Sequence, residues 1–193
     1  MGLDISIETN NSKEIHSDGY FDEKNDYFNK HSLSRTFCNL MCRKNVIDGE
    51  SELDQIGKIT SVDISPITEM ESFGMENNEE LDFYLDTAEN EEERNKILQQ
   101  AKSNQGKLLG NIDKVSLTIE NLLFKLSTID NLPELLDDNG NDTLNNKKYF
   151  SEFNVDKGKG YIDNNFGQDL RNFKRFLEYA KSKGTTTVYF NYG

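Results

Sequence analysis

The stretch that decides the fold is residues 166–192, FGQDLRNFKRFLEYAKSKGTTTVYFNY. Its first part repeats apolar residues at the spacing of one helix face, and these are Phe166, Leu170, Phe173, Leu177 and Ala180. Such spacing is typical of an amphipathic helix that packs on a core. Gly184 suits the position just after the helix, where the backbone turns left-handed. Residues 185–192 are β-branched and aromatic, which predicts a strand.

The segments that flank this helix predict a small sheet. Residues 149–155 have the composition of a strand, and residues 156–163 form a glycine-containing loop before the helix. A strand, a helix and a second strand with a crossover of this length predict a parallel β-α-β unit. Residues 3–8 alternate strictly between apolar and polar side chains, so they predict a further strand of the same sheet. The predicted fold class is therefore α+β with a small mixed sheet.

The middle of the chain predicts helices inside a single domain that spans residues 1–193. We expect helices at 31–44, 79–88, 91–105 and 112–129, an ordered loop at 12–30 that leaves His16 exposed, and a short strand within 59–64. Residues 69–93 hold eleven carboxylates and no lysine or arginine. We interpret residues 69–136 as an acidic helical arm inserted into the domain.

Composition narrows the functional classes. The 193 residues include 22 basic and 35 acidic side chains, a net charge of −13. That charge argues against a general nucleic-acid coat and against binding to anionic membranes. No apolar run is long enough for a transmembrane helix, and no signal peptide is evident. Two cysteines without a disulfide framework favour the cytoplasm, and we expect no cofactor.

A basic segment at residues 156–183 is a candidate ligand site. It holds seven basic and four acidic residues, a local charge of +3, which leaves −16 on the remainder. A glycine-rich loop beside a helix start can receive a phosphate. The segment has neither a P-loop nor a dinucleotide fingerprint, so an ordinary solvated turn is the competing interpretation. The candidate residues for a nucleotide-like anion are Lys157, Gly158, Lys159, Gly160, Arg171 and Arg175.

The acidic segment is a candidate docking surface for a basic partner protein. Uncompensated carboxylates steer a basic partner towards them. The candidate residues are Glu79, Glu80, Asp82 and Asp86. A solvated helical hairpin is the competing interpretation, because acidic runs are ordinary on such helices.

The expected helix at 31–44 carries the remaining candidates for chemistry. On a helical projection His31, Cys38 and Cys42 share one side, with Arg35 between them, and would form a metal site or a nucleophile. No fourth ligand is evident, and free cysteines are often simply buried. Residues 137–142 fail the calcium-loop pattern. Common hydrolase and redox motifs are absent from the sequence, so we expect no enzyme.

Two short motifs carry a resemblance. Met1-Gly2-Leu3-Asp4-Ile5 opens the chain, and Tyr27-Phe28-Asn29-Lys30-His31-Ser32-Leu33 leads into a helix with Phe37. Together they resemble a group of small uncharacterised proteins of phages and prophage-bearing bacteria, although Ser32 to Thr36 departs from that group's helix pattern. The resemblance implies a phage setting and no catalytic residues.

These observations predict a non-enzymatic accessory protein of phage type in the cytoplasm of a bacterial host. It would counteract host defence by binding a host protein or a small ligand. Sequestration of a nucleotide-like anion at the basic segment, with the chain as a possible homo-oligomer, is one alternative. An enzyme or metal site at His31, Cys38 and Cys42 is the other.

Overall fold

The computed structural model describes residues 4–17, 19–43, 49–70, 79–137 and 147–192. These residues form a mostly helical protein with one small two-stranded antiparallel sheet. The elements in chain order are β1 (Ile5–Thr9), α1 (Ser12–Ile15), α2 (Asp26–His31), α3 (Arg35–Cys42), α4 (Glu52–Thr60), α5 (Ser65–Thr68), α6 (Glu79–Thr87), α7 (Glu91–Leu108), α8 (Ile112–Leu126), α9 (Leu132–Leu135), α10 (Lys147–Phe150), α11 (Phe166–Ser182) and β2 (Val188–Tyr192).

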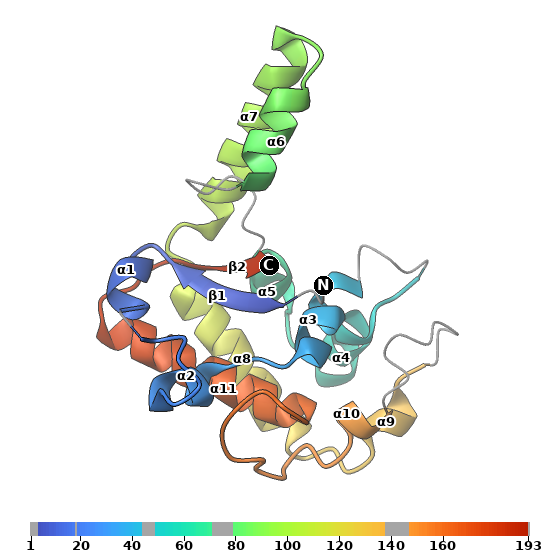
Figure 1. Ribbon diagram of the computed structural model, residues 1–193. Coiled ribbons are helices and arrows are strands. Elements are labelled where there is room, and N and C mark those ends of the chain that lie inside the picture. Colours follow the sequence, from blue (N-terminus) through green and yellow to red (C-terminus); the bar gives the residue numbers. More distant parts are fainter. Residues whose placement is uncertain (1–3, 18, 44–48, 71–78, 138–146, 193) are drawn as a thin grey trace.

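Helix α11 lies at the centre of the packed body, against α8 (Figure 1). The predicted stripe is confirmed, because all five of its apolar residues from Phe166 to Ala180 are buried. Helix α8 contributes Val115, Ile119 and Leu122 from the facing side, all fully buried. Gly184 follows α11 with a φ of +82°, as its position predicts. Burial of these two apolar faces against each other forms the main core.

The sheet differs from the prediction. Strand β1 pairs with β2 in antiparallel register, from Ile5 opposite Tyr192 to Thr9 opposite Val188. The predicted parallel β-α-β unit is wrong, because residues 147–150 form α10 and residues 151–155 are bends, turns and coil. The neighbours Tyr149 and Phe150 are both buried, whereas a strand would turn them to opposite faces.

Two other predicted elements also differ. The expected helix at 31–44 is two helices, α2 and α3, with Ser34 at the start of α3 accepting a hydrogen bond from the backbone of Phe37. This serine favours a new helix start over a continuous helix. The expected strand within 59–64 is the end of α4 and the turn after it. The expected loop at 12–30 contains α1 and most of α2.

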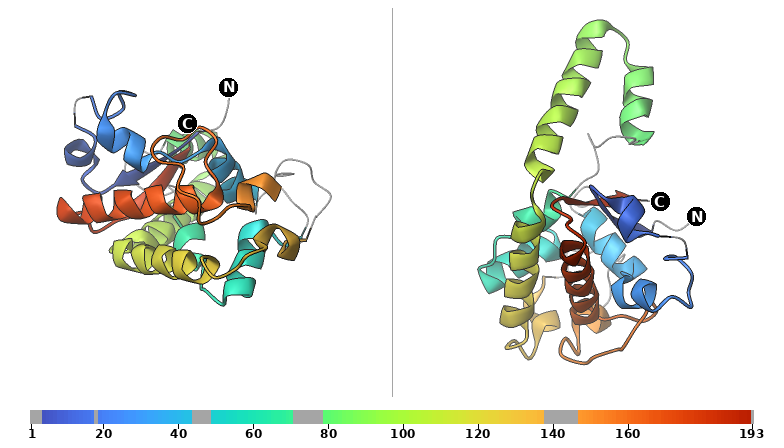
Figure 2. Two further views of the ribbon diagram at one scale, coloured as in Figure 1. Left: turned by 90° about the horizontal axis from the view of Figure 1, so that it is seen from below. Right: turned by 90° about the vertical axis from the view of Figure 1, so that its left-hand side faces the viewer.

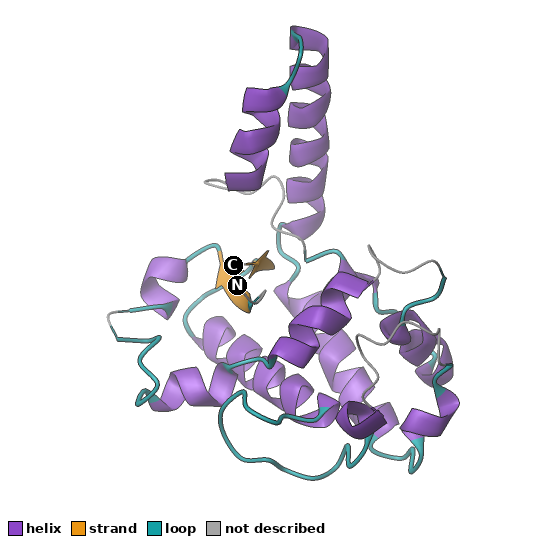
Figure 3. Cartoon of the chain, turned by 45° about the vertical axis from the view of Figure 1, so that its right-hand side comes forward, coloured by secondary structure: helices purple, strands orange, loops and turns teal. Residues whose placement is uncertain are grey.

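Helices α6 and α7 form an antiparallel hairpin that projects from the body (Figures 2 and 3). Within the predicted insertion at 69–136, these two helices stand apart, whereas α8 belongs to the core. None of the described helices combines the length and the apolar character that crossing a bilayer requires.

The first turn of α11 lies very close to the backbone of the segment that precedes the helix. A Cβ placed on Gly167 would lie 2.0 Å from the carbonyl oxygen of Phe153. That carbonyl also accepts a hydrogen bond from the guanidinium of Arg171, at 3.0 Å. The absence of a side chain at Gly167 therefore allows the segment from residue 151 to residue 165 to lie on α11.

We expect Gly167→Ala to lower the free energy of unfolding by about 1–3 kcal/mol, because backbone must move to admit the methyl group. Chemical denaturation would measure the loss. Gly106→Ala is the matched control, since Gly106 lies on α7 and a methyl group placed on it would have nothing within 4 Å. That control should be neutral or gain up to about 1 kcal/mol of helix stability. Equal stability of the two variants would contradict the close approach.

Candidate functional site

A cleft of about 830 Å³ lies between β1, residues between His16 and His31, the start of α3, helix α10 and the loop between α10 and α11. Sites for small ligands usually measure roughly 300–1,000 Å³, so the cleft is large enough for one. Both histidines of the chain, His16 and His31, line it. We therefore treat this cleft as the candidate functional site.

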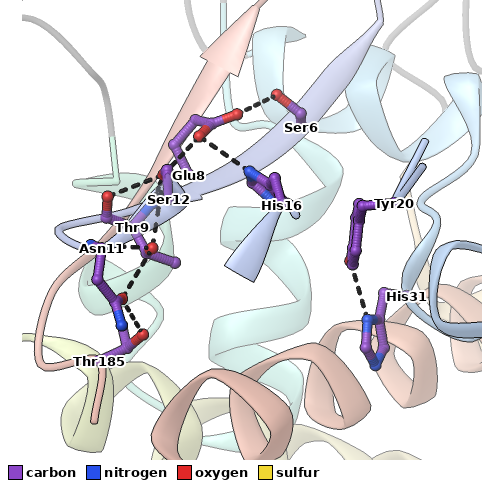
Figure 4. A network of polar contacts seen from close by, with 9 residues as sticks. All are labelled: Ser6, Glu8, Thr9, Asn11, Ser12, His16, Tyr20, His31 and Thr185. Atoms are coloured by element: carbon purple, nitrogen blue, oxygen red, sulfur yellow. Dashed lines mark hydrogen bonds and ion pairs between the residues drawn. The ribbon is translucent and has the colours of Figure 1, made fainter. Parts of the chain in front are cut away.

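His16 is held in the wall of the cleft by a carboxylate on β1 (Figure 4). Its Nδ1 lies 3.4 Å from Oε2 of Glu8, and Ser12 donates a hydrogen bond of 2.6 Å to the same oxygen. Burial raises the pKa of Glu8, but the hydrogen bonds from His16 and Ser12 outweigh burial and bring that pKa below its usual value. Glu8 is therefore ionised at neutral pH and fixes the orientation of the imidazole.

His31 is the second imidazole of the wall, and Tyr20 is its partner. The hydroxyl of Tyr20 and Nδ1 of His31 share a hydrogen bond of 2.9 Å (Figure 4). Burial, and then the charges of Lys30 and Arg175, lower the pKa of His31 to about 4. Burial also raises the pKa of Tyr20. Both side chains are consequently neutral at neutral pH, which suits a structural wall better than proton transfer.

Aromatic rings cover this end of the cleft. Tyr20 meets Phe21 edge-on with 5.2 Å between ring centroids, and Phe28 meets Tyr161 edge-on at 6.4 Å. The ring of His16 lies 4.8 Å from that of Tyr20. Of these rings, that of Phe21 is 55% exposed and is therefore available to an apolar group of a ligand.

A buried carboxylate on α11 positions the opposite wall. Asp169 accepts hydrogen bonds from the backbone N–H and hydroxyl of Ser34, from the hydroxyl of Tyr149 at 2.7 Å and from the side-chain amide of Asn164 at 2.8 Å. Burial raises the pKa of Asp169, and these hydrogen bonds oppose the rise. All three partner residues line the cleft, so this one group fixes three separate segments of its wall.

Of the six residues predicted to bind an anion, four basic and two glycine, Lys157 alone lines the cleft. Lys157 pairs with Glu152, and Lys159 pairs with Asp26. The guanidiniums of Arg171 and Arg175 donate to acceptors in the loop and on α11, which are Phe153 O, Val155 O and Asn172 Oδ1. The amides of Gly158 and Gly160 donate to Asp156 and Asn29. These groups hold the loop onto α11 and α2, and anion binding there stays a prediction.

The acidic candidates lie on the first helix of the projecting hairpin. Asp82 and Asp86 are exposed on α6. Glu79 and Glu80 begin the same helix, and their side chains are outside the described residues. Docking of a partner by this surface also stays a prediction.

The grouping of His31 with the cysteines is wrong, because the break between α2 and α3 separates them onto different helices. His31 faces Tyr20, while Cys38 is buried and Cys42 half-buried on α3. Burial, and then the neighbouring Cys42, raise the pKa of Cys38 to about 12, so its thiol is protonated and unreactive. Within the described ranges, no three metal-ligating side chains gather at one point.

Sequence reasoning missed His16 as a wall residue, since the expected loop leaves it exposed. In the structure the side chain of His16 is only 9% exposed. The available signal was the cluster of Tyr20, Phe21, Tyr27 and Phe28 within a polar segment, because two of these rings, Tyr20 and Phe21, pack against the ring of His16.

No protein-family model matches this chain, and no curated protein or solved structure matches it. Function is therefore inferred from the site itself.

The lowered pKa of His31 predicts a pH dependence of stability. An unfolded histidine titrates near 6.5 and the folded one near 4, so the folded state binds fewer protons between these values. The free energy of unfolding should therefore fall as the pH drops from 6.5 towards 4. His31→Phe should remove this part of the slope in a denaturation series. Identical slopes for the two proteins would show that His31 titrates normally.

Proposed function

We propose that this chain is a non-enzymatic binding protein that holds its ligand in the cleft beside β1. The single observation that supports the proposal is the cleft itself, whose wall combines aromatic rings with fixed polar groups. Pockets that recognise organic ligands have this composition. In keeping with the resemblance of its N-terminal motifs, we propose a phage-type accessory role in a bacterial cytoplasm, where binding would counteract host defence.

The state of the ionisable groups supports binding over catalysis. His31 is neutral and hydrogen-bonded to Tyr20, and the thiol of Cys38 is buried and protonated. General acid–base catalysis favours a group with a pKa near the working pH, and a nucleophilic cysteine needs a lowered pKa. Neither His31 nor Cys38 meets these requirements.

The partners of the basic residues favour the cleft over the basic loop as the ligand site. An anion at the loop would have to displace Glu152 from Lys157 and Asp26 from Lys159. It would also compete with the backbone carbonyls that Arg171 binds. The cleft requires no such rearrangement.

A fragment screen tests the proposed function. We expect small aromatic fragments to shift the amide NMR signals of cleft residues, and Phe21→Ala to weaken their binding at least about fivefold by removing ring contact. Phe124→Ala is the control, because Phe124 is equally a phenylalanine with large exposure, 70% against 55%, but lies on α8 away from the cleft. A screen in which no fragment shifts the cleft signals would overturn the proposal.

The projecting hairpin is a second candidate, as a docking surface for a basic host protein. Phe83 on α6 is 63% exposed and Leu98 on α7 is 43% exposed. Phe83 also lies edge-on to Tyr84, which is 43% exposed, and neighbouring exposed apolar side chains mark a candidate interaction surface. The exposed carboxylates of Asp82 and Asp86 beside Phe83 provide complementary charge for a basic partner.

Capture of one basic host protein, followed by kinetics with the purified pair, tests this candidate. We expect Asp82→Asn/Asp86→Asn to lower the association rate severalfold at low salt and to make it less sensitive to salt, because steering is electrostatic. Asp130→Asn, an exposed acid after α8, should change the rate little. Association that is independent of salt would contradict steering by the hairpin.

A further inference from the structure

The outer edge of β1 is the edge that faces away from β2. In the ladder, the backbone N–H of Asn10 donates to the carbonyl of Thr187, in continuation of the register that pairs Thr9 with Val188. In an antiparallel pair, every second residue exchanges hydrogen bonds with the partner strand, and the residues between point their peptide groups away. Ser6 and Glu8 therefore bond to β2, whereas the peptide groups of Ile5, Ile7 and Thr9 point to the opposite edge.

The outward backbone groups of the two strands differ in whether they have hydrogen-bond partners. On β2, the side chain of Asn111 bonds to both the N–H and the carbonyl of Val188, and the N–H of Phe190 donates to the carbonyl of Met70. On β1, Ser12 bonds to the peptide groups of Thr9. For the outward N–H and C=O of Ile5 and Ile7, the described part of the chain offers no hydrogen-bond partner. Open edges are normally covered, because they pair with other chains.

The cleft runs along this open edge. Four consecutive residues, Asp4 to Ile7, line it, whereas β2 contributes Asn191 alone. Consecutive side chains of a strand point to opposite faces, so a cavity that touches all four residues includes the strand edge between those faces. Ser32 to Thr36 line it as well. In the view of Figure 1 this segment passes β1 on the side away from β2.

The wall formed by Ser32 to Thr36 is already held from behind. The carbonyl of Ser32 accepts a hydrogen bond from Asn172, and the N–H of Ser34 donates to Asp169, both on α11. The wall is therefore fixed before any ligand enters. The more exposed aromatic side chains of Phe21 and Phe28 lie in the same cleft, where they can receive an apolar side chain of a strand-like ligand.

The charges of the lining favour a basic occupant. Four acidic and three basic side chains line the cleft. Arg35 is paired with Asp4, and Lys157 with Glu152. The lining therefore carries a formal balance of −1, of the same sign as the −13 of the whole chain, which favours a basic occupant over an acidic one.

We propose that the outer edge of β1 binds an extended, basic segment of a partner protein, which pairs with the peptide groups of Ile5 and Ile7 as a third strand inside the cleft. This inference rests on the proposed function, since it names the class of ligand that the cleft holds. Backbone hydrogen bonds supply affinity in this mode of recognition, and the aromatic wall selects side chains.

Synthetic peptides test the proposal. Heptapeptides would be selected on the full chain from a random display library, synthesised, and compared with copies that are N-methylated at alternate residues. A peptide that pairs along one edge presents alternate N–H groups to β1, so methylation of one set should weaken binding more than tenfold and methylation of the other set should be tolerated. The bound peptide should shift the amide NMR signals of Ile5 and Ile7.

A variant of β1 tests the same bonds from the protein side. Ile5→Pro removes an outward N–H and leaves the hydrogen bonds between β1 and β2 intact, because proline is tolerated on an edge strand. Ile5→Ala is the matched control, since it removes most of the same side chain and keeps the N–H. We expect peptide binding to fall more than tenfold in Ile5→Pro relative to Ile5→Ala. The methylated peptides decide the question if Ile5→Pro does not fold.

The outcomes separate this inference from the proposed function. Peptides or fragments that bind in the cleft without any effect of alternate methylation would overturn the third-strand proposal and leave the proposed function standing. If neither peptides nor fragments shift the amide NMR signals of the cleft, both the third-strand proposal and the proposed function are overturned. Peptides that carry no excess of lysine or arginine would overturn the basic character of the partner.

Discussion

The buried carboxylate of Asp169 is the constraint on which the rest of the structure depends. It lies on the central helix and accepts hydrogen bonds from Ser34, Tyr149 and Asn164, which come from three separate segments of the chain. An isolated buried charge is very costly, so the arrangement is stable only when all these donors are in place. One carboxylate thereby fixes the start of α3, helix α10 and the loop before α11 relative to one another.

The same helix satisfies the backbone of the long segment that precedes it. Gln168 and Asn172 are fully buried and bind backbone groups of Lys157, Gly158, Gly160 and Ser32. Buried backbone groups need such partners where no regular structure supplies them. The irregular segment consequently becomes a rigid wall, and the cleft between it and β1 is an architectural feature of the fold.

Much of the helical framework was predictable, whereas the site was not. Helical spacing in the stripe from Phe166 to Ala180 depends only on local periodicity, and the structure confirms it. Tyr149 and Phe150 misled the prediction, because aromatic residues favour strands until tertiary packing against Phe166 decides otherwise. His16 became a wall residue through its contact with Glu8, a partner on a strand that local patterns do not place beside it.

The sequence by itself determined which faces are apolar, the terminal strands and the acidic middle, since periodicity and charge are local properties of a chain. Only the tertiary structure decided that the two terminal strands pair antiparallel, that the histidines share a cleft and that the basic loop is bound to α11. These are contacts between residues far apart in sequence, such as Asn172 with Ser32. Their geometry emerges only when the helices pack and leave one strand edge open.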